Sequence, residues 1–124
     1  MILSHSSMRY LLGIYELSRG AEKVRSSELA KLMGVSKASI VKICSQLVAQ
    51  GLITKEYYGS IYLTESGIEH ARDTLSKVRV LEAFFIRTFG LRENIAHEDA
   101  ISCLCNLSDE CSGNMIRYAM KQEG

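Results

Sequence analysis

The sequence predicts a mainly α-helical chain with one short β-hairpin, arranged as two consecutive domains. Apolar residues recur at helical spacing through most of the chain, and residues 52–63 suit two short strands around a turn. Nine glycines and several capping side chains punctuate a chain that has no proline. With 124 residues, 47% of them hydrophobic, the chain can bury a core.

The first two predicted helices are short and end at glycines. The first runs over about residues 6–19, with apolar positions at helical spacing and Gly20 at its end. Ser26 or Ser27 is expected to cap the second helix, because serine side chains accept hydrogen bonds from free amides. Gly34 is expected to end the second helix, since glycine adopts the left-handed backbone at little cost.

The third predicted helix, residues 37–50, has two different faces. Ser36 is expected to cap it and Gly51 to close it. Its buried stripe is predicted to be Ile40, Ile43, Cys44, Leu47 and Val48. Its solvent face is predicted to be Ser39, Lys42, Gln46 and Ala49. Two short helices joined by a tight glycine turn are typical of a helix-turn-helix.

The predicted hairpin follows this third helix and forms a wing. Its strands are residues 52–57 and 60–63, around a turn that contains Gly59. One of Tyr57 and Tyr58 is expected to pack onto the third helix and the other to be exposed. A winged helix-turn-helix domain is therefore predicted over residues 1–66.

A helical domain is predicted over residues 67–124. Thr64 is expected to cap a long helix that runs to about Phe89 and ends at Gly90. Two smaller helices are expected near residues 97–107 and 108–121. Residues 78–86 of the long helix are more apolar than one core-facing stripe requires, which indicates a further apolar contact.

Charge is divided unevenly between the two halves of the chain. The formal net charge is +1, but residues 1–64 carry +4 and residues 65–124 carry −3. A basic first half suggests that this half meets a polyanion. Chance segregation of surface charge is the alternative.

The helix-turn-helix and the wing supply the candidate DNA-binding residues. The leading residues of a helix in the major groove meet base edges, and lysine, arginine, serine and tyrosine also bind phosphate. The candidates are Arg25, Ser36, Lys37, Ser39, Lys42, Lys55, Tyr57 and Tyr58. The alternatives are an ordinary solvated helix face, or a winged-helix protein-interaction module without DNA binding.

Several other classes are excluded or disfavoured. The sequence has no phosphate-binding glycine loop, metallohydrolase motif or nucleophile elbow, and its three histidines are scattered, so we do not expect an enzyme. No apolar run reaches the length of a membrane span, and the start does not resemble a signal peptide. We expect a cytoplasmic protein whose four cysteines are reduced, with Cys44 in the core.

Nine segments, taken in order, carry a resemblance to a known family. They cover nearly the whole chain: YLLGIYEL (10–17), VRSSELA (24–30), VSKASI (35–40), GLI (51–53), YGSIYLTESG (58–67), LEAFF (81–85), FGL (89–91), HEDA (97–100) and LSD (107–109). The chain resembles the iron- and manganese-dependent repressors of the diphtheria toxin repressor family. Its length is similar to the short manganese-regulator type, without the additional SH3-like domain.

The resemblance implies a homodimeric transcription regulator, with repression as its favoured action, that binds a palindromic operator in double-stranded DNA. In this family the later helices supply both the dimer interface and a site for a divalent transition metal. The implied interface residues are Val80, Leu81, Phe84, Phe85 and Phe89. Filling the core of a single protomer is the alternative role for these residues.

The metal ligands that the resemblance implies are largely replaced. Ligand positions of the family are occupied by Arg9, Leu12, Val78, Ile101 and Leu104. Glu82 and His97 remain, and Cys105 is a candidate soft substitute. Because a transition metal needs about four to six ligands, we expect regulation that does not depend on the usual metal.

Two replacement hypotheses follow from these departures. In the first, Arg9 takes the place of the cation and pairs with Glu82 or a nearby carboxylate. In the second, Cys103, Cys105 and Cys111 form a thiol site for a soft metal, an iron–sulfur cluster or redox sensing. Idle or buried thiols are the alternative to this thiol or iron–sulfur sensor.

Overall fold

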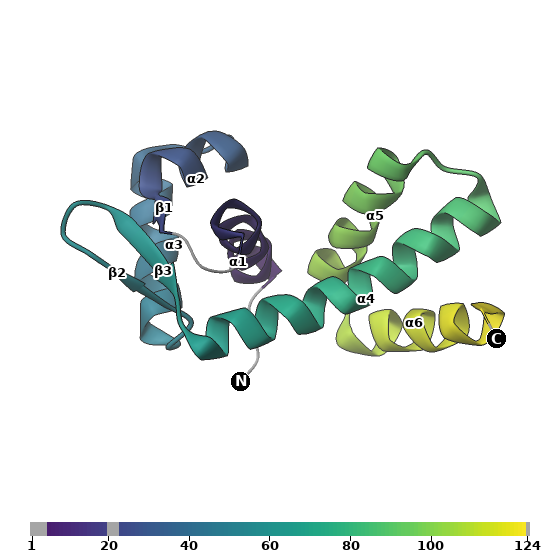
Figure 1. The fold of residues 1–124 in the computed structure, drawn as a ribbon. Coiled ribbons are helices and arrows are strands. Elements are labelled where there is room, and N and C mark those ends of the chain that lie inside the picture. The colour runs from purple at the N-terminus through teal and green to yellow at the C-terminus, as the bar shows by residue number, and fades with distance from the viewer. Residues whose placement is uncertain (1–4, 20–22, 124) are drawn as a thin grey trace. The chain divides into compact units, whose positions relative to one another are not determined.

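The computed structural model describes residues 5–19 and 23–123. Within these ranges it contains six helices and three short strands (Figure 1). The chain divides into two compact units, Met1–Arg72 and Asp73–Gly124. The division falls inside the long helix α4 (Glu65–Phe89), slightly later than the boundary expected from the sequence.

The first unit is built on three helices that contact one another: α1 (His5–Ser18), α2 (Ser26–Met33) and α3 (Lys37–Ala49). Their apolar stripes meet the inner residues of a small sheet. The fully buried side chains of this core are Leu11, Ile14, Val24, Leu29, Ile40, Leu47, Leu52, Ile53 and Ile61. The predicted helix-turn-helix is therefore present. Gly20, which was predicted to end the first helix, lies outside the described residues.

The predicted turn between α2 and α3 is confirmed. Gly34 ends α2 with φ +67°, a left-handed conformation in which a side chain would be strained. Ser36 caps α3, and its hydroxyl accepts a hydrogen bond from the Ser39 amide at 3.2 Å. These two local features fix where α3 begins.

The predicted serine cap of α2 is wrong. Arg25, in extended conformation, holds the N-cap position, and its backbone amide donates to the Glu28 carboxylate at 3.2 Å. Ser26 and Ser27 are already inside the helix. The Ser26 hydroxyl instead donates to the Gly59 carbonyl at 2.9 Å, a contact 33 residues away that local capping rules cannot anticipate.

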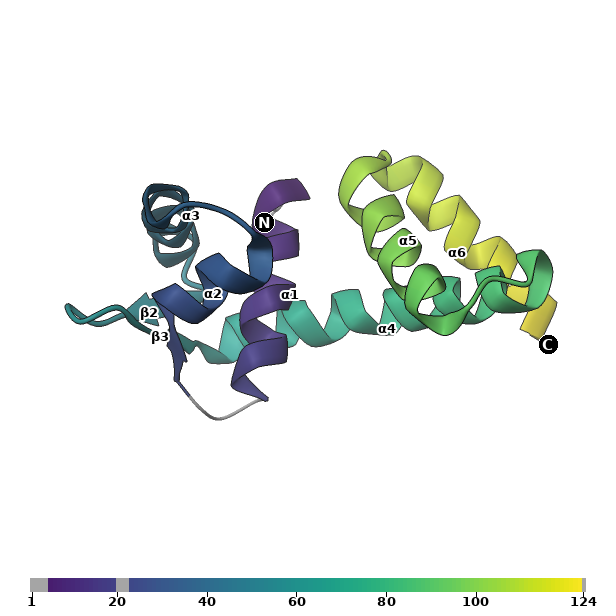
Figure 2. The same ribbon diagram turned by 90° about the horizontal axis from the view of Figure 1, so that it is seen from above.

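The sheet has three antiparallel strands in the order β1-β3-β2. They are β1 (Val24–Arg25), β2 (Ile53–Lys55) and β3 (Ser60–Leu63), and Ile61 at the centre pairs with both neighbouring strands. Strand β1 was not predicted, because two residues are too few to show an alternating pattern. The β2–β3 hairpin is the predicted wing, and in Figures 1 and 2 it projects from the first unit on the side of α2 and α3.

One member of the predicted buried stripe of α3 is misplaced. Ile40, Cys44 and Leu47 are buried and Ile43 is half-buried, but Val48 is 44% exposed. The fully buried residues follow i, i+4, i+7 spacing. Val48 is the next residue along and turns away from this narrow stripe by about 100°.

The first turn of α4 is locked to the end of α3. The Thr64 hydroxyl accepts from the Gly67 amide at 3.0 Å and donates to the Gly51 carbonyl at 2.7 Å. The Thr64 amide donates to the Leu52 carbonyl at 3.0 Å. The predicted threonine cap is thereby confirmed, and it also ties the helix to the strand that follows α3.

The second unit contains the rest of α4 with α5 (Glu93–Asn106) and α6 (Asp109–Glu123). Aromatic rings link α4 to α6, with the ring centroids of Phe84 and Tyr118 5.8 Å apart. The core is completed by Val78, Leu81, Ala96, Ala100, Leu104 and Ala119. Gly90, with φ +66°, ends α4 as predicted.

No single helix in the described residues is long and apolar enough to cross a membrane. Only α2 and α3 together meet the length and composition test, and they are bent by 109° at the turn that joins them.

The contact between Gly67 and Leu52 leads to a stability prediction. A Cβ at Gly67 would lie 2.0 Å from the Leu52 carbonyl oxygen, so Gly67→Ala must displace backbone. We expect a loss of about 2 kcal/mol or more in the free energy of unfolding, measured by urea denaturation. Gly113→Ala is the control, because the nearest atom to its added Cβ is 3.7 Å away in an exposed arginine side chain. This control should be stabilised by about 0.5–1 kcal/mol. Equal stability of the two variants would contradict the packing described.

Candidate nucleic-acid interface

A groove of about 650 Å³ lies in the first unit, where the start of α2, the start of α3 and the wing come together. It is lined by Lys23, Arg25, Ser26, Ser27, Lys37, Val41, Lys55, Tyr57, Tyr58, Gly59 and Ser60. Four of these residues are cationic, and none of the described residues that line the groove is acidic. The groove therefore presents concentrated positive charge to the solvent.

Two backbone arrangements bring these cations together. The Ser26 amide and hydroxyl both donate to the Gly59 carbonyl at 2.9 Å, which holds the start of α2 against the turn of the wing. Pairing of β1 with β3 places Arg25 opposite Ser60, and pairing of β2 with β3 places Lys55 opposite Ile61. The cap at Ser36 starts α3 so that Lys37 lies in its first turn.

Five of the eight predicted DNA-binding residues line this groove: Arg25, Lys37, Lys55, Tyr57 and Tyr58. Lys42 is exposed on α3 but does not line it. The hydroxyls of Ser36 and Ser39 lie 3.1 Å apart at the N-terminus of α3, where the Ser36 hydroxyl caps the helix. Two lining residues were not among the predicted ones: Lys23, which precedes the unpredicted strand β1, and Val41, which belongs to neither predicted face of α3.

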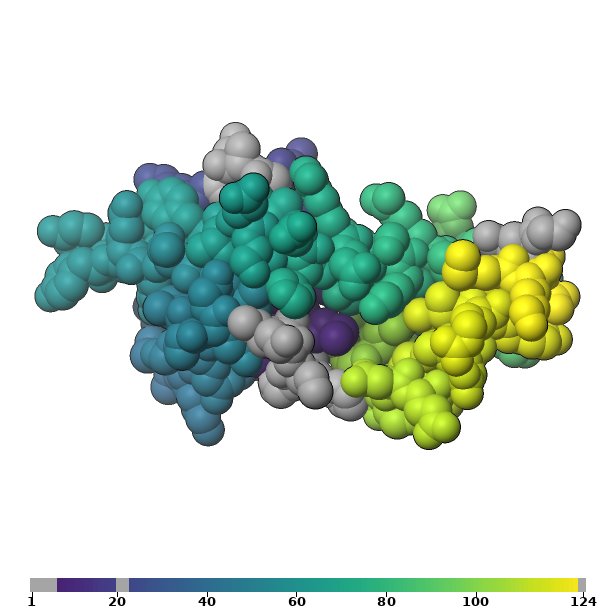
Figure 3. Space-filling model, turned by 90° about the horizontal axis from the view of Figure 1, so that it is seen from below, coloured from purple at the N-terminus to yellow at the C-terminus, as the bar shows by residue number. Residues whose placement is uncertain are grey.

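The tyrosines of the wing differ from the prediction that one of them packs onto α3. Tyr57 is 95% exposed and Tyr58 is 90% exposed, and their rings meet edge to face with centroids 5.3 Å apart. The turn from Glu56 to Gly59, closed by a 3.0 Å hydrogen bond, carries them past the end of the sheet. In the space-filling view the wing projects beyond the surface of α3 in the same unit (Figure 3).

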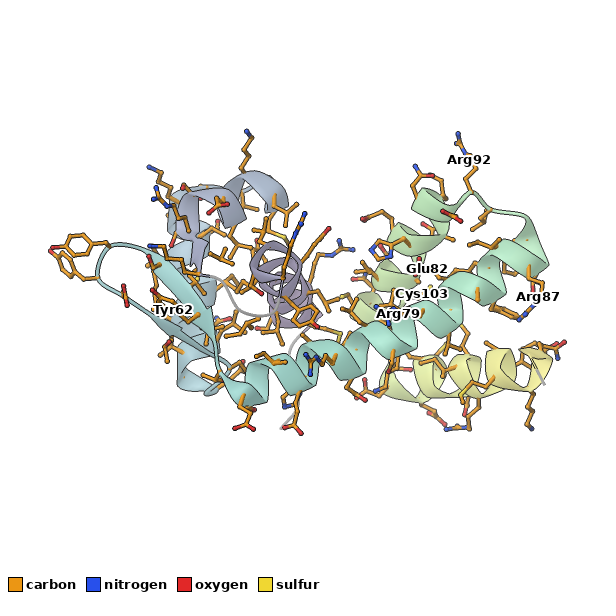
Figure 4. All side chains as sticks on the ribbon, in the orientation of Figure 1. Tyr62, Arg79, Glu82, Arg87, Arg92 and Cys103 are labelled. Carbon is orange, nitrogen blue, oxygen red and sulfur yellow. The ribbon has the colours of Figure 1, made fainter. Side chains whose placement is uncertain are left out.

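Tyr62 on β3, labelled in Figure 4, interacts with Glu56, the acidic residue that precedes the wing tyrosines. Partial burial, the negative charge of Glu56 and a hydrogen bond between their side chains raise the pKa of the Tyr62 phenol. The phenol therefore stays protonated and donates to the Glu56 carboxylate. This hydrogen bond occupies the carboxylate of Glu56, and Glu56 does not line the groove.

In the second unit, Glu82 on α4 and His97 on α5 form a pair, with His97 Nδ1 3.3 Å from Glu82 Oε1. Cys105 is buried, with 2% of its surface exposed. Among the described residues no three His, Cys, Asp or Glu side chains are arranged to hold a metal ion. The pair alone supplies too few ligands for a transition metal, so the residues present do not fit such a site.

The cysteines differ in exposure. Cys111 is exposed, Cys103 is half-buried (labelled in Figure 4), and Cys44 and Cys105 are buried. The expectation that Cys44 belongs to the core is thus confirmed. Burial, followed by the nearby negative groups Asp99 and Cys111, raises the pKa of the Cys103 thiol. A raised pKa leaves less of the reactive thiolate at neutral pH.

Comparisons with known proteins agree with this architecture. Residues 7–56 match the MarR family, and residues 64–121 match the iron dependent repressor, metal binding and dimerisation domain. The chain is 33% identical over 109 residues to an uncharacterized HTH-type transcriptional regulator of Methanocaldococcus jannaschii, and the match covers 87% of each protein. The chain belongs to the diphtheria toxin repressor and manganese transport regulator family of transcription regulators.

Two other members of this family are longer than the chain. Transcriptional regulator MntR of Escherichia coli is 27% identical over 101 residues, which cover 82% of this chain and 64% of MntR. The crystal structure of T. acidophilum IdeR aligns with a TM-score of 0.79 at 23% identity, covering 99% of this chain and 56% of IdeR. The chain thus spans less than two thirds of MntR and little more than half of IdeR, and the likeness to IdeR shows the shared fold.

The residues that the family resemblance assigns to a dimer interface have different environments in the protomer. Leu81, Phe84 and Phe85 are at most 8% exposed, and Val80 is half-buried. Phe89 is 63% exposed at the end of α4. It borders an apolar hollow of about 310 Å³ that is also lined by Phe85, Leu91, Asp99, Ser102 and Cys103. Of the five residues, Phe89 and Val80 therefore keep the most solvent-exposed surface in the single protomer.

The cysteine environments lead to a prediction about thiol reactivity. A thiol-specific alkylating reagent should modify Cys111 first, and Cys103 more slowly at neutral pH because its thiolate is scarce. The Cys103 rate should rise as the pH is raised through its elevated pKa. Asp99→Asn should speed the reaction of Cys103 at neutral pH by lowering that pKa, whereas Glu93→Gln, on an exposed acid that is not among the groups raising this pKa, should not. Peptide mass spectrometry over time measures both rates, and equal neutral-pH rates for Cys103 and Cys111 would refute this assignment.

Proposed function

We propose that this chain is a homodimeric DNA-binding repressor that inserts α3 into the major groove and places the wing against the phosphate backbone. The observation that carries the proposal is the groove with four cations and no acid among its described lining residues. A duplex carries one negative charge per ~1.7 Å of its axis, so a cationic groove beside an exposed helix suits it.

The arrangement of α3 supports this role. Its buried stripe fixes the helix on α1 and α2, so the opposite face, with Lys37, Val41 and Lys42, is presented to solvent. Capping at Ser36 leaves the N-terminal turn exposed, and this is the part of a recognition helix that meets base edges. Lys23, Lys55 and the wing tyrosines flank it as candidate phosphate ligands.

The second unit supports the dimeric part of the proposal. The exposed Phe89 and the apolar hollow beside it offer a surface that a second copy of the chain covers. A two-fold dimer presents two α3 helices to two half-sites, so we propose a palindromic operator. We propose a cytoplasmic location, in line with the transcription regulators that the chain is similar to.

We further propose that DNA binding by this chain does not require a transition metal. Val78 and Leu104 stand where the family resemblance places metal ligands, and they are 0% and 8% exposed in the core of the second unit. Glu82 is partnered by His97. Arg9 lies half-buried on α1, and its pairing with Glu82 stays a prediction.

The cation groove can be tested by substitution and salt dependence. Lys37→Ala and Lys55→Ala should each weaken binding to all duplexes and lower the slope of log affinity against log salt by about 1. Fluorescence anisotropy at several salt concentrations measures this slope. Lys31→Ala is the matched control, because Lys31 is an exposed lysine of the same unit that does not line the groove. A slope that changes equally in all three variants would count against the groove.

Metal independence can be tested on the same duplexes. Affinity should be unchanged after chelation and after addition of manganese, iron or zinc, because the described ligands are too few. His97→Ala should likewise leave the DNA affinity measured after chelation close to that of the wild type, because His97 is proposed to pair with Glu82 and not to hold a metal. Binding that appears only when metal is added would refute this part of the proposal.

A further inference from the structure

Val41 is an exposed apolar residue on the solvent face of α3. It is 54% exposed, although its neighbour Ile40 is buried in the core. Val41 follows Lys37 by one helical turn, so the two side chains share a face, and both line the cationic groove. A β-branched apolar side chain in an exposed helical position is favoured neither by helix propensity nor by burial.

The chemistry of this position limits what Val41 can recognise. A valine side chain neither donates nor accepts a hydrogen bond, so it cannot pair with the polar edges of guanine, cytosine or adenine. In the major groove only thymine presents a methyl group, at C5, and small apolar side chains pack against it. A valine placed against a guanine or cytosine edge would instead remove water from polar groups without replacing their hydrogen bonds.

We propose that Val41 reads the 5-methyl group of a thymine in the operator and so sets base preference at one position of each half-site. The inference rests on the proposed insertion of α3 into the major groove. Lys37, one turn earlier, then contacts a neighbouring base or phosphate, and its charge provides affinity without the discrimination that the methyl contact adds.

The test begins with duplexes that the wild-type full-length protein selects from a random pool. Each thymine of the selected half-site is then replaced by deoxyuridine, which removes the methyl group and keeps every hydrogen-bonding atom. Affinities are measured for the wild type and for Val41→Ala. The matched control is Val48→Ala, an exposed valine of the same helix that does not line the groove.

We expect one thymine position at which deoxyuridine weakens wild-type binding about fourfold, the worth of one buried methyl group. Val41→Ala should bind the thymine duplex about as weakly as the wild type binds the deoxyuridine duplex, and it should no longer distinguish the two. Val48→Ala should keep the full sensitivity. Unchanged melting temperatures, expected at exposed sites, confirm that the variants are folded.

Two other outcomes overturn the inference in distinguishable ways. If the wild type selects and binds a sequence but Val41→Ala remains as sensitive to deoxyuridine as the wild type, the Val41 assignment fails while the proposed function stands. If the wild type enriches no duplex and shows no salt-dependent binding, the proposed function fails, and the Val41 inference fails with it.

Discussion

The cationic groove depends on one constraint, the pair of hydrogen bonds from Ser26 to the carbonyl of Gly59. These bonds join the first turn of α2 to the turn of the wing, two segments that are distant in the sequence. Gly59 accepts both bonds in a left-handed conformation with φ +86°, and an added Cβ would lie 3.4 Å from the Ser26 hydroxyl oxygen. The wing thus has a fixed position beside α2 and α3, where Lys55 joins Arg25 and Lys37.

Features decided by neighbouring residues could be predicted from the sequence, and features decided by distant contacts could not. The serine and threonine caps at Ser36 and Thr64 and the glycine at position 34 have their causes within a few residues, so they were found. The prediction that Ser26 caps α2 was wrong because its hydroxyl donates instead to the carbonyl of Gly59, 33 residues away. Strand β1 was missed because it exists only through pairing with β3.

The candidate site shows the same division. Its cations on α3 and the wing were predicted, since a charged residue on a helix face or at a hairpin tip is visible in the pattern. Lys23 joined them only because β1 places it there. Val41 belonged to neither predicted face of α3, and it lies outside the narrow buried stripe of Ile40, Cys44 and Leu47.

The second unit suggests how a member of this family keeps its shape with few metal ligands. Where coordination holds helices together, each ligand is a polar group that costs free energy to bury without its ion. Val78 and Leu104 are instead buried apolar side chains, which contribute packing whether or not a metal is present. The Glu82–His97 pair satisfies two polar groups that would otherwise have needed an ion or water. If DNA binding is metal-independent as we propose, packing of α4 with α5 and α6 would hold these helices in place of a metal, and their positions would not depend on metal supply.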